Sequence, residues 1–269
     1  MKILITSAGN KVWLVKAFRD AMFNTEITVQ DTGDYVSSSF FSDERIDKIV
    51  KKDKFDFICY TRNAEILEAS KTDHKNLPSY RTCLNCIDKH EFAKFCIAND
   101  FEIPLTLITE RLFYKPIDGS GSKGIGSIDG KDRIFQEFID WPEYTIDVFI
   151  HPDGIPISAV PRSRLKVVDG ESWVSRTVKD HNLIAAGIDI CVKMGLIWQN
   201  TVQCFYNGKD IRYIEINPRF AGGTPLSIAA GANSPFWIIQ ILQGKKVKPQ
   251  IGKFKDGLTM IKYTEEVFF

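Results

Sequence analysis

The sequence has no excess of charge of one sign and no long apolar run. Its 35 Lys and Arg residues nearly balance 34 Asp and Glu residues over 269 positions. The composition therefore provides no basic field that would hold nucleic acid or an anionic membrane surface. No stretch approaches the roughly 18 consecutive apolar residues that a membrane-spanning helix requires. We expect neither a nucleic acid nor a membrane as a partner.

Cysteine and histidine are sparse, with six and four residues. Cys59, Cys191 and Cys204 lie in apolar runs, which is typical of small buried side chains. Cys83 and Cys86 have CxxC spacing, but no second CxxC or spaced His pair accompanies them, so zinc is disfavoured. No spacing suggests a Ser-His-Asp or Cys-His nucleophile. Free thiols and an opening too short in apolar length for a signal peptide predict a cytoplasmic protein.

The first third of the chain alternates strand and helix patterns. Lys2–Thr6, Glu26–Gln30 and Phe55–Tyr60 are apolar strands, and residues 12–23 carry apolar side chains at helical spacing. This order is typical of a doubly wound parallel sheet. The first loop holds only Gly9 in place of GxGxxG, so we do not predict dinucleotide binding. Further helices are expected at 45–51, at 63–70, after the capping residue Asp88, at 180–196 and within 221–242.

A glycine-rich segment follows the strand Leu112–Lys115. Its residues 119–124 read Gly-Ser-Gly-Ser-Lys-Gly, but the sequence after them does not open a helix, and Ile125 breaks the P-loop pattern. The segment is therefore predicted as a strand–loop–strand hairpin whose backbone amides and hydroxyls cover phosphates. The alternative is a mobile surface turn. Later strands are expected at 133–139, 144–150, 157–166, 201–206 and 211–216, with a hairpin turn at 169–171.

The segment Tyr213–Gly223 carries the most specific pattern. Glu215 and Asn217 stand two apart in a β-branched run, so both should lie on one face of a strand that Pro218 ends. A carboxylate and an amide oxygen at a strand end suit Mg²⁺, which completes its coordination with water and phosphate. The alternative is a core strand with two stray polar residues.

Gln203 is a further candidate ligand, on the preceding strand. A three-residue loop at 207–209 would pair Gln203 with Tyr213, diagonal to Glu215. A loop with an even number of residues would instead separate Gln203 from the metal. The assignment therefore depends on the geometry of one hairpin.

Three motifs in this order resemble the ATP-grasp superfamily, and most closely its branch related to the large subunit of carbamoyl phosphate synthetase. They are Lys115 with the glycine loop, Gln136–Ile139 with Glu143–Val148, and Gln203 with Glu215–Arg219. The resemblance covers nearly the whole chain. It implies an α/β fold, α+β in its nucleotide-binding part. The expected units are an N-terminal parallel-sheet domain (1–86), a small Gly-loop subdomain (87–140) and a C-terminal subdomain with the metal site (141–269).

The resemblance also implies roles for individual residues. Those expected to hold the ATP phosphates are Lys89, Lys115, Gly119, Ser120, Gly121, Ser122, Lys123 and Gly124. Those expected around adenosine are Glu137, Phe138, Ile139 and Glu143. Those expected to ligate Mg²⁺, or Mn²⁺ in its place, are Gln203, Glu215 and Asn217. Those expected to act on the transferred phosphoryl group are Arg219 and Lys115.

Three arginines near the 169–171 turn are candidates for an acidic substrate. Arg162, Arg164 and Arg176 could bind a carboxylate bidentately, the alternative being an exposed polar sheet face.

The family typically phosphorylates a carboxylate and lets an amine or another nucleophile attack the acyl phosphate. We therefore expect an ATP- and Mg²⁺-dependent carboxylate–amine ligase with small-molecule substrates, and family habit favours a homodimer. The alternatives are carbamoyl-phosphate-type phosphoryl transfer and a catalytically silent nucleotide-binding relative. The chain departs from the family pattern in two short intervals, 104–115 and 126–136, which predicts a trimmed Gly-loop subdomain.

Overall fold

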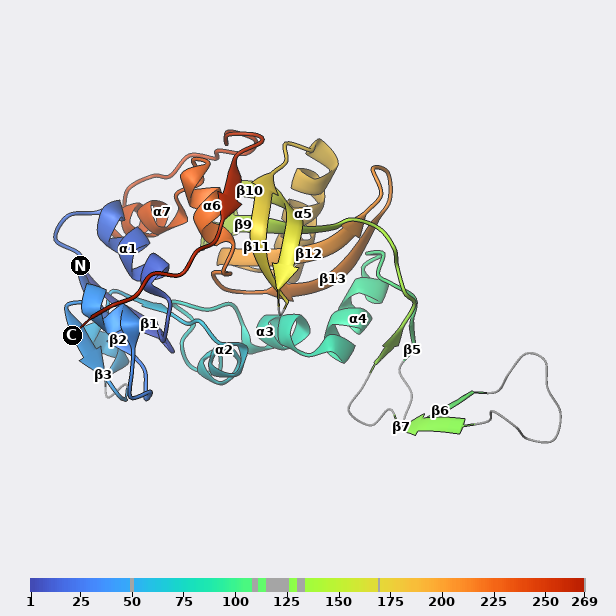
Figure 1. The fold of residues 1–269 in the computed structure, drawn as a ribbon, viewed down its shortest axis with the longest axis horizontal. Coiled ribbons are helices and arrows are strands. Elements are labelled where there is room, and N and C mark those ends of the chain that lie inside the picture. Colours follow the sequence, from blue (N-terminus) through green and yellow to red (C-terminus); the bar gives the residue numbers. More distant parts are fainter. Residues whose placement is uncertain (49–50, 108–110, 115–125, 130–133, 169, 269) are drawn as a thin grey trace.

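The computed structural model describes residues 1–48, 51–107, 111–114, 126–129, 134–168 and 170–268, with the backbone alone described at 107, 111–114 and 126–129. A parallel sheet lies at one end of the molecule and a larger antiparallel sheet lies at its centre (Figure 1). Two short strands, β6 (Arg111–Tyr114) and β7 (Gly126–Asp129), lie at the opposite end.

The N-terminal sheet has the predicted parallel arrangement, in the order β3-β2-β1-β4. Its elements in chain order are β1 (Lys2–Thr6), α1 (Val12–Ala21), β2 (Glu26–Gln30), the 3-10 turn η1 (Ser37–Phe41), β3 (Glu44–Ile46), a second 3-10 turn η2 (Lys52–Lys54), β4 (Phe57–Cys59) and α2 (Asn63–Ala69). The strands β1, β2 and β4 are mostly buried on both faces, as their apolar sequences require, whereas the edge strand β3 is exposed.

The helix expected at residues 45–51 is wrong, because residues 44–46 form the edge strand β3. This strand pairs with β2 in parallel register, with Thr28 opposite Glu44. Asp43 fixes its start: the carboxylate accepts a 2.6 Å hydrogen bond from the Ile27 amide and pairs with Arg19. These contacts link positions far apart in the sequence, so a local helical pattern could not reveal them.

Two helices connect the sheets. Asp88 caps α4 (Lys89–Ala98) as predicted, since its carboxylate accepts from the His90 and Glu91 amides. The preceding helix is α3 (Tyr80–Ile87), and it begins within residues 71–81, whose polar sequence is typical of a turn. Ser79 caps it by accepting from the Thr82 amide. The α3 helix contacts the edge strand of the large sheet and so brings the start of α4 toward that strand.

The central sheet is antiparallel, as expected, in the order β13-β12-β9-β10-β11-β14. Its strands are β9 (Glu143–Ile150), β10 (Pro156–Val168), β11 (Glu171–Thr177), β12 (Trp198–Tyr206), β13 (Ile211–Asn217) and β14 (Thr259–Ile261). The predicted helix at 180–196 is α5 (His181–Met194), which ends at Gly195 in the left-handed conformation, φ 72°. The region 221–242 holds two helices, α6 (Thr224–Ala229) and α7 (Ser234–Leu242), where we expected one.

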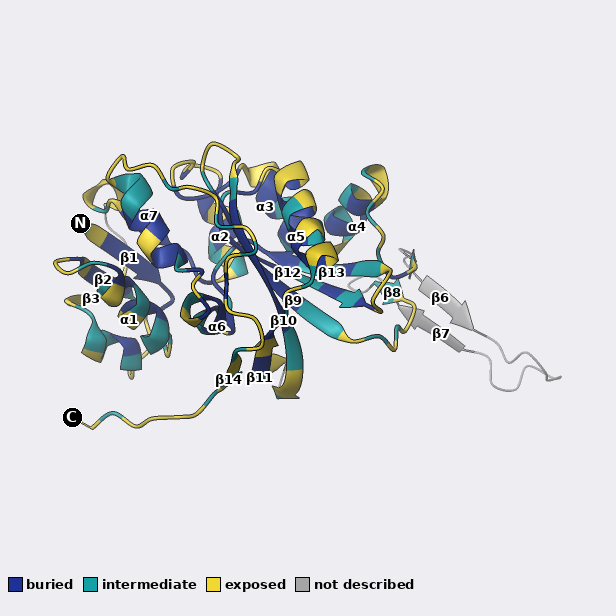
Figure 2. Cartoon of the chain, turned by 90° about the horizontal axis from the view of Figure 1, so that it is seen from above, coloured by how far each residue is buried: buried dark blue, intermediate teal, exposed yellow. Residues whose placement is uncertain are grey.

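Helices cover the two faces of this sheet differently. Gly187 of α5 packs on Ile146 and Val148 of β9, so α5 covers the face to which even-numbered β9 residues point. Ser227 of α6 bonds Asp147, which points to the other face. The functional side chains described below lie on this second face. Figure 2 shows the strands of both sheets as the most buried part of the molecule.

The described part of the predicted Gly-loop region consists of short strands. The expected strand at 133–139 is reduced to β8 (Phe135–Gln136), which pairs with β5 (Thr106–Leu107). Strands β6 and β7 pair in antiparallel fashion, with Tyr114 opposite Gly126, and this confirms the strands of the predicted hairpin. Residues 115–125 between them lie outside the described residues.

One apolar core runs through both sheets. Aromatic side chains make the junction: Phe57 of β4 meets Trp198 of β12 at 5.3 Å between ring centroids, and Phe18 of α1 meets Phe220 at 5.9 Å. Phe149 then joins this cluster to Trp237 of α7. The N-terminal sheet is therefore held firmly against the central sheet, which fixes the geometry of residues that meet between them.

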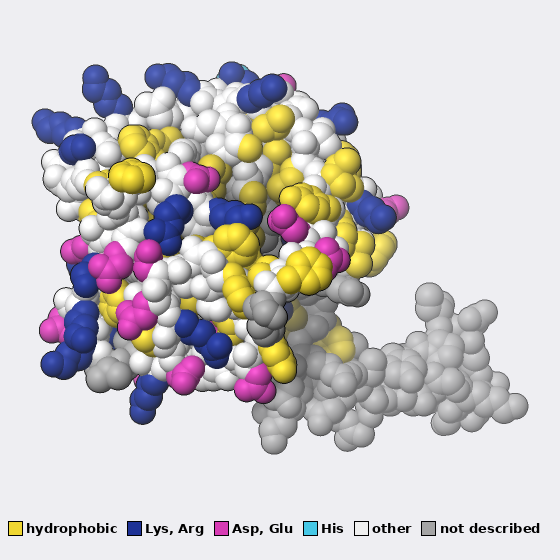
Figure 3. All heavy atoms as spheres, turned by 60° about the vertical axis from the view of Figure 1, so that its left-hand side comes forward, with side chains coloured by type: hydrophobic (Ala, Val, Ile, Leu, Met, Phe, Trp, Pro, Cys, Tyr) yellow, Lys and Arg dark blue, Asp and Glu magenta, His cyan; other side chains and the backbone are white. Residues whose placement is uncertain are grey.

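The surface agrees with the balanced composition. Figure 3 shows Lys and Arg side chains interspersed with Asp and Glu over one face of the molecule. In the part of the chain that the structure describes, no helix has the length and apolarity to cross a bilayer.

All six cysteines are buried free thiols. Burial raises the pKa of Cys83 to about 11 and that of Cys59, Cys96 and Cys204 to about 12, and it raises the pKa of Cys86 and Cys191 as well. At pH 8 the thiolate fraction of Cys83 is then about one in a thousand. We expect no reaction with a chromogenic disulfide reagent in the native state and six equivalents in denaturant. Rapid native labelling would contradict the observed burial.

Candidate nucleotide and metal site

The predicted metal strand is β13, and its pairing with β12 brings Gln203 directly opposite Glu215. The hairpin loop has four residues, 207–210, because Tyr206 pairs with Ile211. The expected three-residue loop and the diagonal pairing are therefore wrong. A bulge between Gln203 and Cys204 shifts the register by one residue and restores the contact that an even loop would have broken.

The bulge also separates Tyr213 from Glu215. Tyr213 pairs with the buried Cys204, and its hydroxyl donates a 3.0 Å hydrogen bond to the Ala186 carbonyl in α5. Its side chain therefore faces α5, whereas Glu215 and Asn217 face the opposite side with Gln203. Simple alternation therefore ends at the bulge, so Tyr213 does not share the face of Glu215 and Asn217.

Glu215 is the centre of a hydrogen-bond network. Its Oε1 accepts from Gln203 Nε2 at 2.9 Å and from Asn217 Nδ2 at 2.8 Å. Its Oε2 accepts from Lys89 Nζ at 3.2 Å. Lys89 is the first residue of α4, where the Asp88 cap fixes the helix start. Three other residues predicted for the site thus contact the Glu215 carboxylate.

Arg219 joins this network through a residue that the sequence analysis missed. Arg219 Nε donates to Asn63 Oδ1 at 2.9 Å, and Asn63 Nδ2 donates to Asn217 Oδ1 at 3.1 Å. Burial lowers the pKa of Arg219, and the nearby carboxylates of Glu215 and Glu171 oppose that shift. Asn63 follows strand β4, and ligand sites in parallel sheets lie outside such strand ends. That position is the one signal that could have identified it.

A second ion pair borders the network. Arg164 pairs with Glu143, donates to Gln203 Oε1 at 3.3 Å and donates to the Gly170 carbonyl at 2.6 Å. The structure therefore places Glu143, predicted for the ribose, and Arg164, predicted for substrate, side by side next to the metal strand. In this arrangement Arg164 contacts the amide oxygen of Gln203, and the amide nitrogen faces Glu215.

Arg162 does not lie on an exposed sheet face. Its side chain is 2% exposed and binds Asp147 bidentately, with Nε–Oδ2 at 2.8 Å and Nη2–Oδ1 at 3.2 Å. Asp147 also accepts from three hydroxyls, those of Thr201, Thr224 and Ser227. The expected substrate contact by Arg162 does not fit this position, because the guanidinium is buried and paired with Asp147.

Gly223 shows why this buried pair bears on the site. A Cβ added there would overlap the Arg162 guanidinium, so the chain after Arg219 packs directly on the ion pair.

Arg176, in contrast, pairs with Ser163 and so points to the face opposite Arg162 and Arg164. It donates to Thr259 Oγ1 at 2.9 Å. The predicted cluster of three arginines is therefore split between the two faces.

Three of the predicted adenosine residues follow the short strand β8. Glu137 is exposed and its amide donates to the Leu105 carbonyl, Phe138 is 91% exposed, and Ile139 is half-buried. The remaining phosphate candidates lie outside the described residues: Lys115, Gly119, Ser120, Gly121, Ser122, Lys123 and Gly124.

The donor set around Glu215 fits Mg²⁺. It combines one carboxylate with the amides of Gln203 and Asn217, whose side chains contact the same carboxylate oxygen. Turning either amide about its terminal bond would present an oxygen to an ion beside Glu215. Among the described residues, no group of three or more His, Cys, Asp and Glu side chains could hold a metal. A centre with few protein ligands, completed by phosphate and water, is the kind that Mg²⁺ uses.

Comparisons with known proteins agree with this architecture. A family model described as "ATP-grasp in the biosynthetic pathway with Ter operon" matches residues 130–266. No curated protein gives a significant match to the sequence. The matched segment contains strands β9 to β13 and therefore the whole metal strand.

Solved structures share the fold at low sequence identity. The phosphoribosylaminoimidazole carboxylase ATPase subunit from Aquifex aeolicus is 13% identical with a TM-score of 0.69, over 93% of this chain and 78% of that one. Biotin carboxylase from Campylobacter jejuni is 12% identical with a TM-score of 0.68, over 96% and 74%. Pyruvate carboxylase from Rhizobium etli is 12% identical with a TM-score of 0.69, and 96% of this chain covers 29% of that one. The family match spans half of the chain, and the chain belongs to the ATP-grasp family.

Proposed function

We propose that this protein is an ATP- and Mg²⁺-dependent ligase that joins a carboxylate to an amine. The observation that supports it most is the single network in which Glu215, Asn217 and Gln203 meet Lys89 and Arg219. The network combines oxygen ligands suited to Mg²⁺ with two cationic side chains, and phosphoryl transfer requires both to neutralise the charge of the phosphates. The structural likeness to the solved carboxylases supports the fold in which this chemistry would take place.

The proposed reaction has two steps. A substrate carboxylate oxygen attacks the γ-phosphorus of ATP, the bond to the β-phosphate oxygen breaks, and ADP leaves. A neutral amine nitrogen then attacks the acyl carbon, a carbon–nitrogen bond forms, phosphate leaves with the bonding electron pair, and the nitrogen releases a proton to solvent. Positioning and charge neutralisation carry both steps, so no protein nucleophile is needed.

Each residue of the network has a place in this proposal. Gln203, Glu215 and Asn217 would hold Mg²⁺, or Mn²⁺ in its place, which neutralises phosphate oxygens. Lys89, now paired with Glu215, would contact the phosphates, and Arg219 would face the transferred group. Lys115 and the 119–124 loop remain predicted to cover the phosphates, Glu137 to Ile139 to contact adenine, and Glu143 to contact the ribose.

The two alternatives differ from this proposal in testable ways. Carbamoyl-phosphate-type transfer would use the same metal strand, with a different carboxyl substrate. A silent relative would bind nucleotide without turnover. The intact network of Glu215, Asn217, Lys89 and Arg219 favours an active site, because a decayed site is expected to have lost at least one of these residues.

Thermal melting tests nucleotide binding. Mg-ATP at 100 times its dissociation constant should raise the free energy of unfolding by about 2.7 kcal/mol. ATP with a chelator should give a much smaller shift, because the proposed contact to Glu215 runs through the metal. Absence of any shift at millimolar Mg-ATP would contradict the active site and leave only the fold. ADP release from mixtures of carboxylates and amines then tests the ligase reaction itself.

A further inference from the structure

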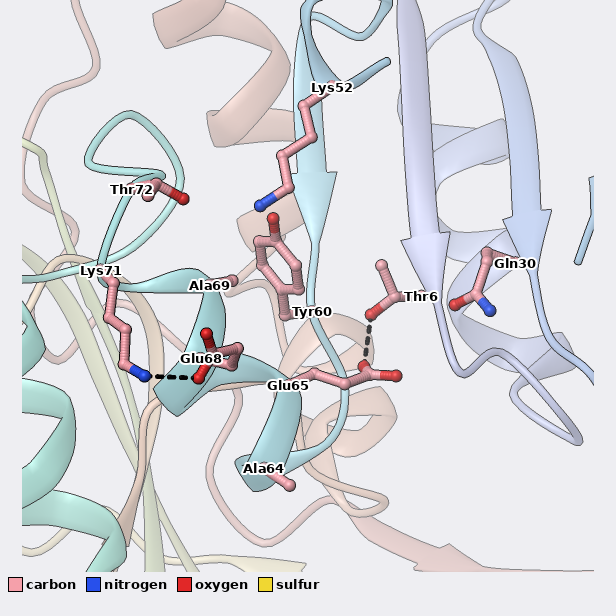
Figure 4. Close-up of a pocket in the computed structure, with 10 residues that line it drawn as sticks. All are labelled: Thr6, Gln30, Lys52, Tyr60, Ala64, Glu65, Glu68, Ala69, Lys71 and Thr72. Atoms are coloured by element: carbon pink, nitrogen blue, oxygen red, sulfur yellow. Dashed lines mark hydrogen bonds and ion pairs between the residues drawn. The ribbon is translucent and has the colours of Figure 1, made fainter. Parts of the chain in front are cut away.

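A cleft of about 600 Å³ opens at the carboxyl ends of the N-terminal strands. The ends of β1, β2 and β4 contribute Thr6, Gln30 and Tyr60, and helix α2 contributes Glu65 (Figure 4). Strands β2 and β4 lie on either side of β1, so the sheet order reverses here. Ligands of open α/β sheets bind in crevices at such a reversal. The network around Glu215 does not use this cleft.

Glu65 is held in the cleft with hydrogen-bonding capacity to spare. Its Oε2 accepts from Thr6 Oγ1 at 2.8 Å, and its Oε1 accepts from the Ser7 hydroxyl. A carboxylate offers about four lone-pair positions, so two contacts leave room for further donors. Glu65 is also half-buried, which strengthens its attraction for a cation. It therefore presents a fixed, partly unsatisfied anion to the cleft.

The backbone of Ser7 has a conformation that is strained for a residue with a side chain. Its φ of 43° lies in the left-handed region, where a glycine would be unstrained. The amide of Ser7 donates to Gln30 Oε1 at 3.3 Å, and its carbonyl accepts from Lys11 Nζ at 2.8 Å. Strain of this kind clusters at ligand sites. The serine hydroxyl that fixes Glu65 is the reason to keep a side chain here.

Helix α2 links the cleft to the network around Glu215. Asn63 and Glu65 are two residues apart in α2, with their Cα atoms about 5 Å apart and their side chains on different sides of the helix. Asn63 contacts both Asn217 and Arg219, whereas Glu65 contacts Thr6 and Ser7. Burial lowers the pKa of Lys11, the Arg62 and Arg219 cations lower it further, and Glu65 opposes the shift. The charges of Glu65 and Arg219 thus act on the same lysine, which connects the cleft electrostatically to the network.

The far end of the cleft carries the opposite charge. Lys52 and Glu65 lie at opposite ends, with the Tyr60 ring between them (Figure 4). Lys52 Nζ is 5.7 Å from the Tyr60 ring centroid, and among the described residues it forms no ion pair. Lys71, which also borders the cleft, is already paired with Glu68 at 2.6 Å. The free cation and the free anion of the cleft are therefore Lys52 and Glu65.

We propose that this cleft binds the amine substrate, and that the substrate is a primary amine with an anionic group at its other end. Glu65 binds the amine, and Lys52 binds the anionic group. This inference rests on the proposed ligase function. The amine nitrogen at Glu65 loses a proton to solvent and then forms the carbon–nitrogen bond as phosphate leaves.

Calorimetric binding to the full chain in the presence of a non-hydrolysable Mg-ATP analogue tests the proposal. The probes are glycine, β-alanine and 4-aminobutyrate, compared with ethylamine, propylamine and butylamine and with the hydroxy acids of the same lengths. We expect at least one amino acid to bind, and to bind more tightly than its alkylamine and its hydroxy acid. Failure of all amino acids to bind at about 10 mM, or tighter binding of the hydroxy acids, would overturn it.

Three variants test which residue binds the amine end of the substrate and which binds its anionic end. Glu65→Gln should weaken binding of the best amino acid at least about tenfold, because a charge-assisted contact is lost. Lys52→Met should weaken the amino acid similarly and leave the alkylamine unchanged. Glu26→Gln is the control. It removes a carboxylate at the amino end of β2, far from the cleft at the carboxyl ends, where Glu26 pairs with Lys2, and it should match the wild type. Equal amino acid affinity in Glu65→Gln and wild type would overturn the proposal.

Nucleotide binding separates this proposal from the one on which it rests. Glu65→Gln should keep the wild-type thermal shift with Mg-ATP, because Glu65 does not contact the Glu215 network. If wild type binds Mg-ATP but no amino acid, the cleft assignment is wrong and the ligase proposal stands. If wild type fails to bind Mg-ATP, the proposed function is wrong, whatever the amines do.

Discussion

Glu215→Ala is expected to abolish ADP formation while the protein stays folded. The carboxylate is the point at which Gln203, Asn217 and Lys89 meet, and it is the only charged member of the proposed metal ligands. Loss of the metal removes several kcal/mol of charge stabilisation from the transition state. Since 1.36 kcal/mol is a factor of ten, turnover should fall at least about 100-fold. A coupled assay of ADP release measures it.

The fold should tolerate this change, because the Glu215 side chain is 31% exposed and water can replace its contacts. We expect a loss of about 1 kcal/mol in unfolding free energy. Glu102→Ala is the matched control: that carboxylate is 70% exposed and pairs with Arg212 of the same strand. It should retain both activity and the Mg-ATP thermal shift. Turnover like that of the wild type in Glu215→Ala would show that the metal assignment is wrong.

Local patterns predicted most elements but not the register of the metal strand. Alternation placed Glu215 and Asn217 on one face, and the Gly195 and Asp88 signals marked helix ends correctly. The bulge beside Gln203 was not visible, because a bulge is set by how two strands fit together and not by either strand alone. Gln203 therefore lies opposite Glu215 through a hairpin geometry that differs from the predicted one.

Contacts between distant parts of the chain were the other gap. Asn63 meets Asn217 across 154 positions, and β3 exists because Asp43 is anchored by Ile27 and Arg19. Neither contact leaves a periodic trace in the sequence. The resemblance to ATP-grasp proteins supplied the roles of Lys89 and Arg219, but it gave no indication that an N-terminal residue would join them.

Arg162 shows that sequence patterns also do not reveal which strand face is buried. A face of a strand is exposed or buried only according to what packs on it. Helix α6 and Gly223 cover this one, so a side chain predicted for substrate instead forms a buried ion pair. The consequence is that one residue couples the stability of the central sheet to the position of the segment carrying Arg219.

Asp147→Ala is therefore expected to be the most destabilising of the changes considered. It would leave the Arg162 guanidinium buried without its partner and remove the acceptor of Thr201 and Ser227. Breaking a buried pair from one side costs about 3–5 kcal/mol. With a urea m-value of about 2–3 kcal/mol/M, the unfolding midpoint should fall by about 1–2 M. Urea titration followed by tryptophan fluorescence measures the change.

A double variant separates the charge from the packing. Asp147→Leu with Arg162→Met removes both charges together, so it should recover part of the loss, as buried pairs replaced by apolar side chains commonly do. Recovery should be incomplete, because the hydroxyls of Thr201, Thr224 and Ser227 lose their shared acceptor. The exposed pair broken by Glu102→Ala should cost no more than about 1 kcal/mol. If Asp147→Ala is as mild as that control, the buried pair does not support the sheet, and the packing of Gly223 on Arg162 must be maintained by other contacts.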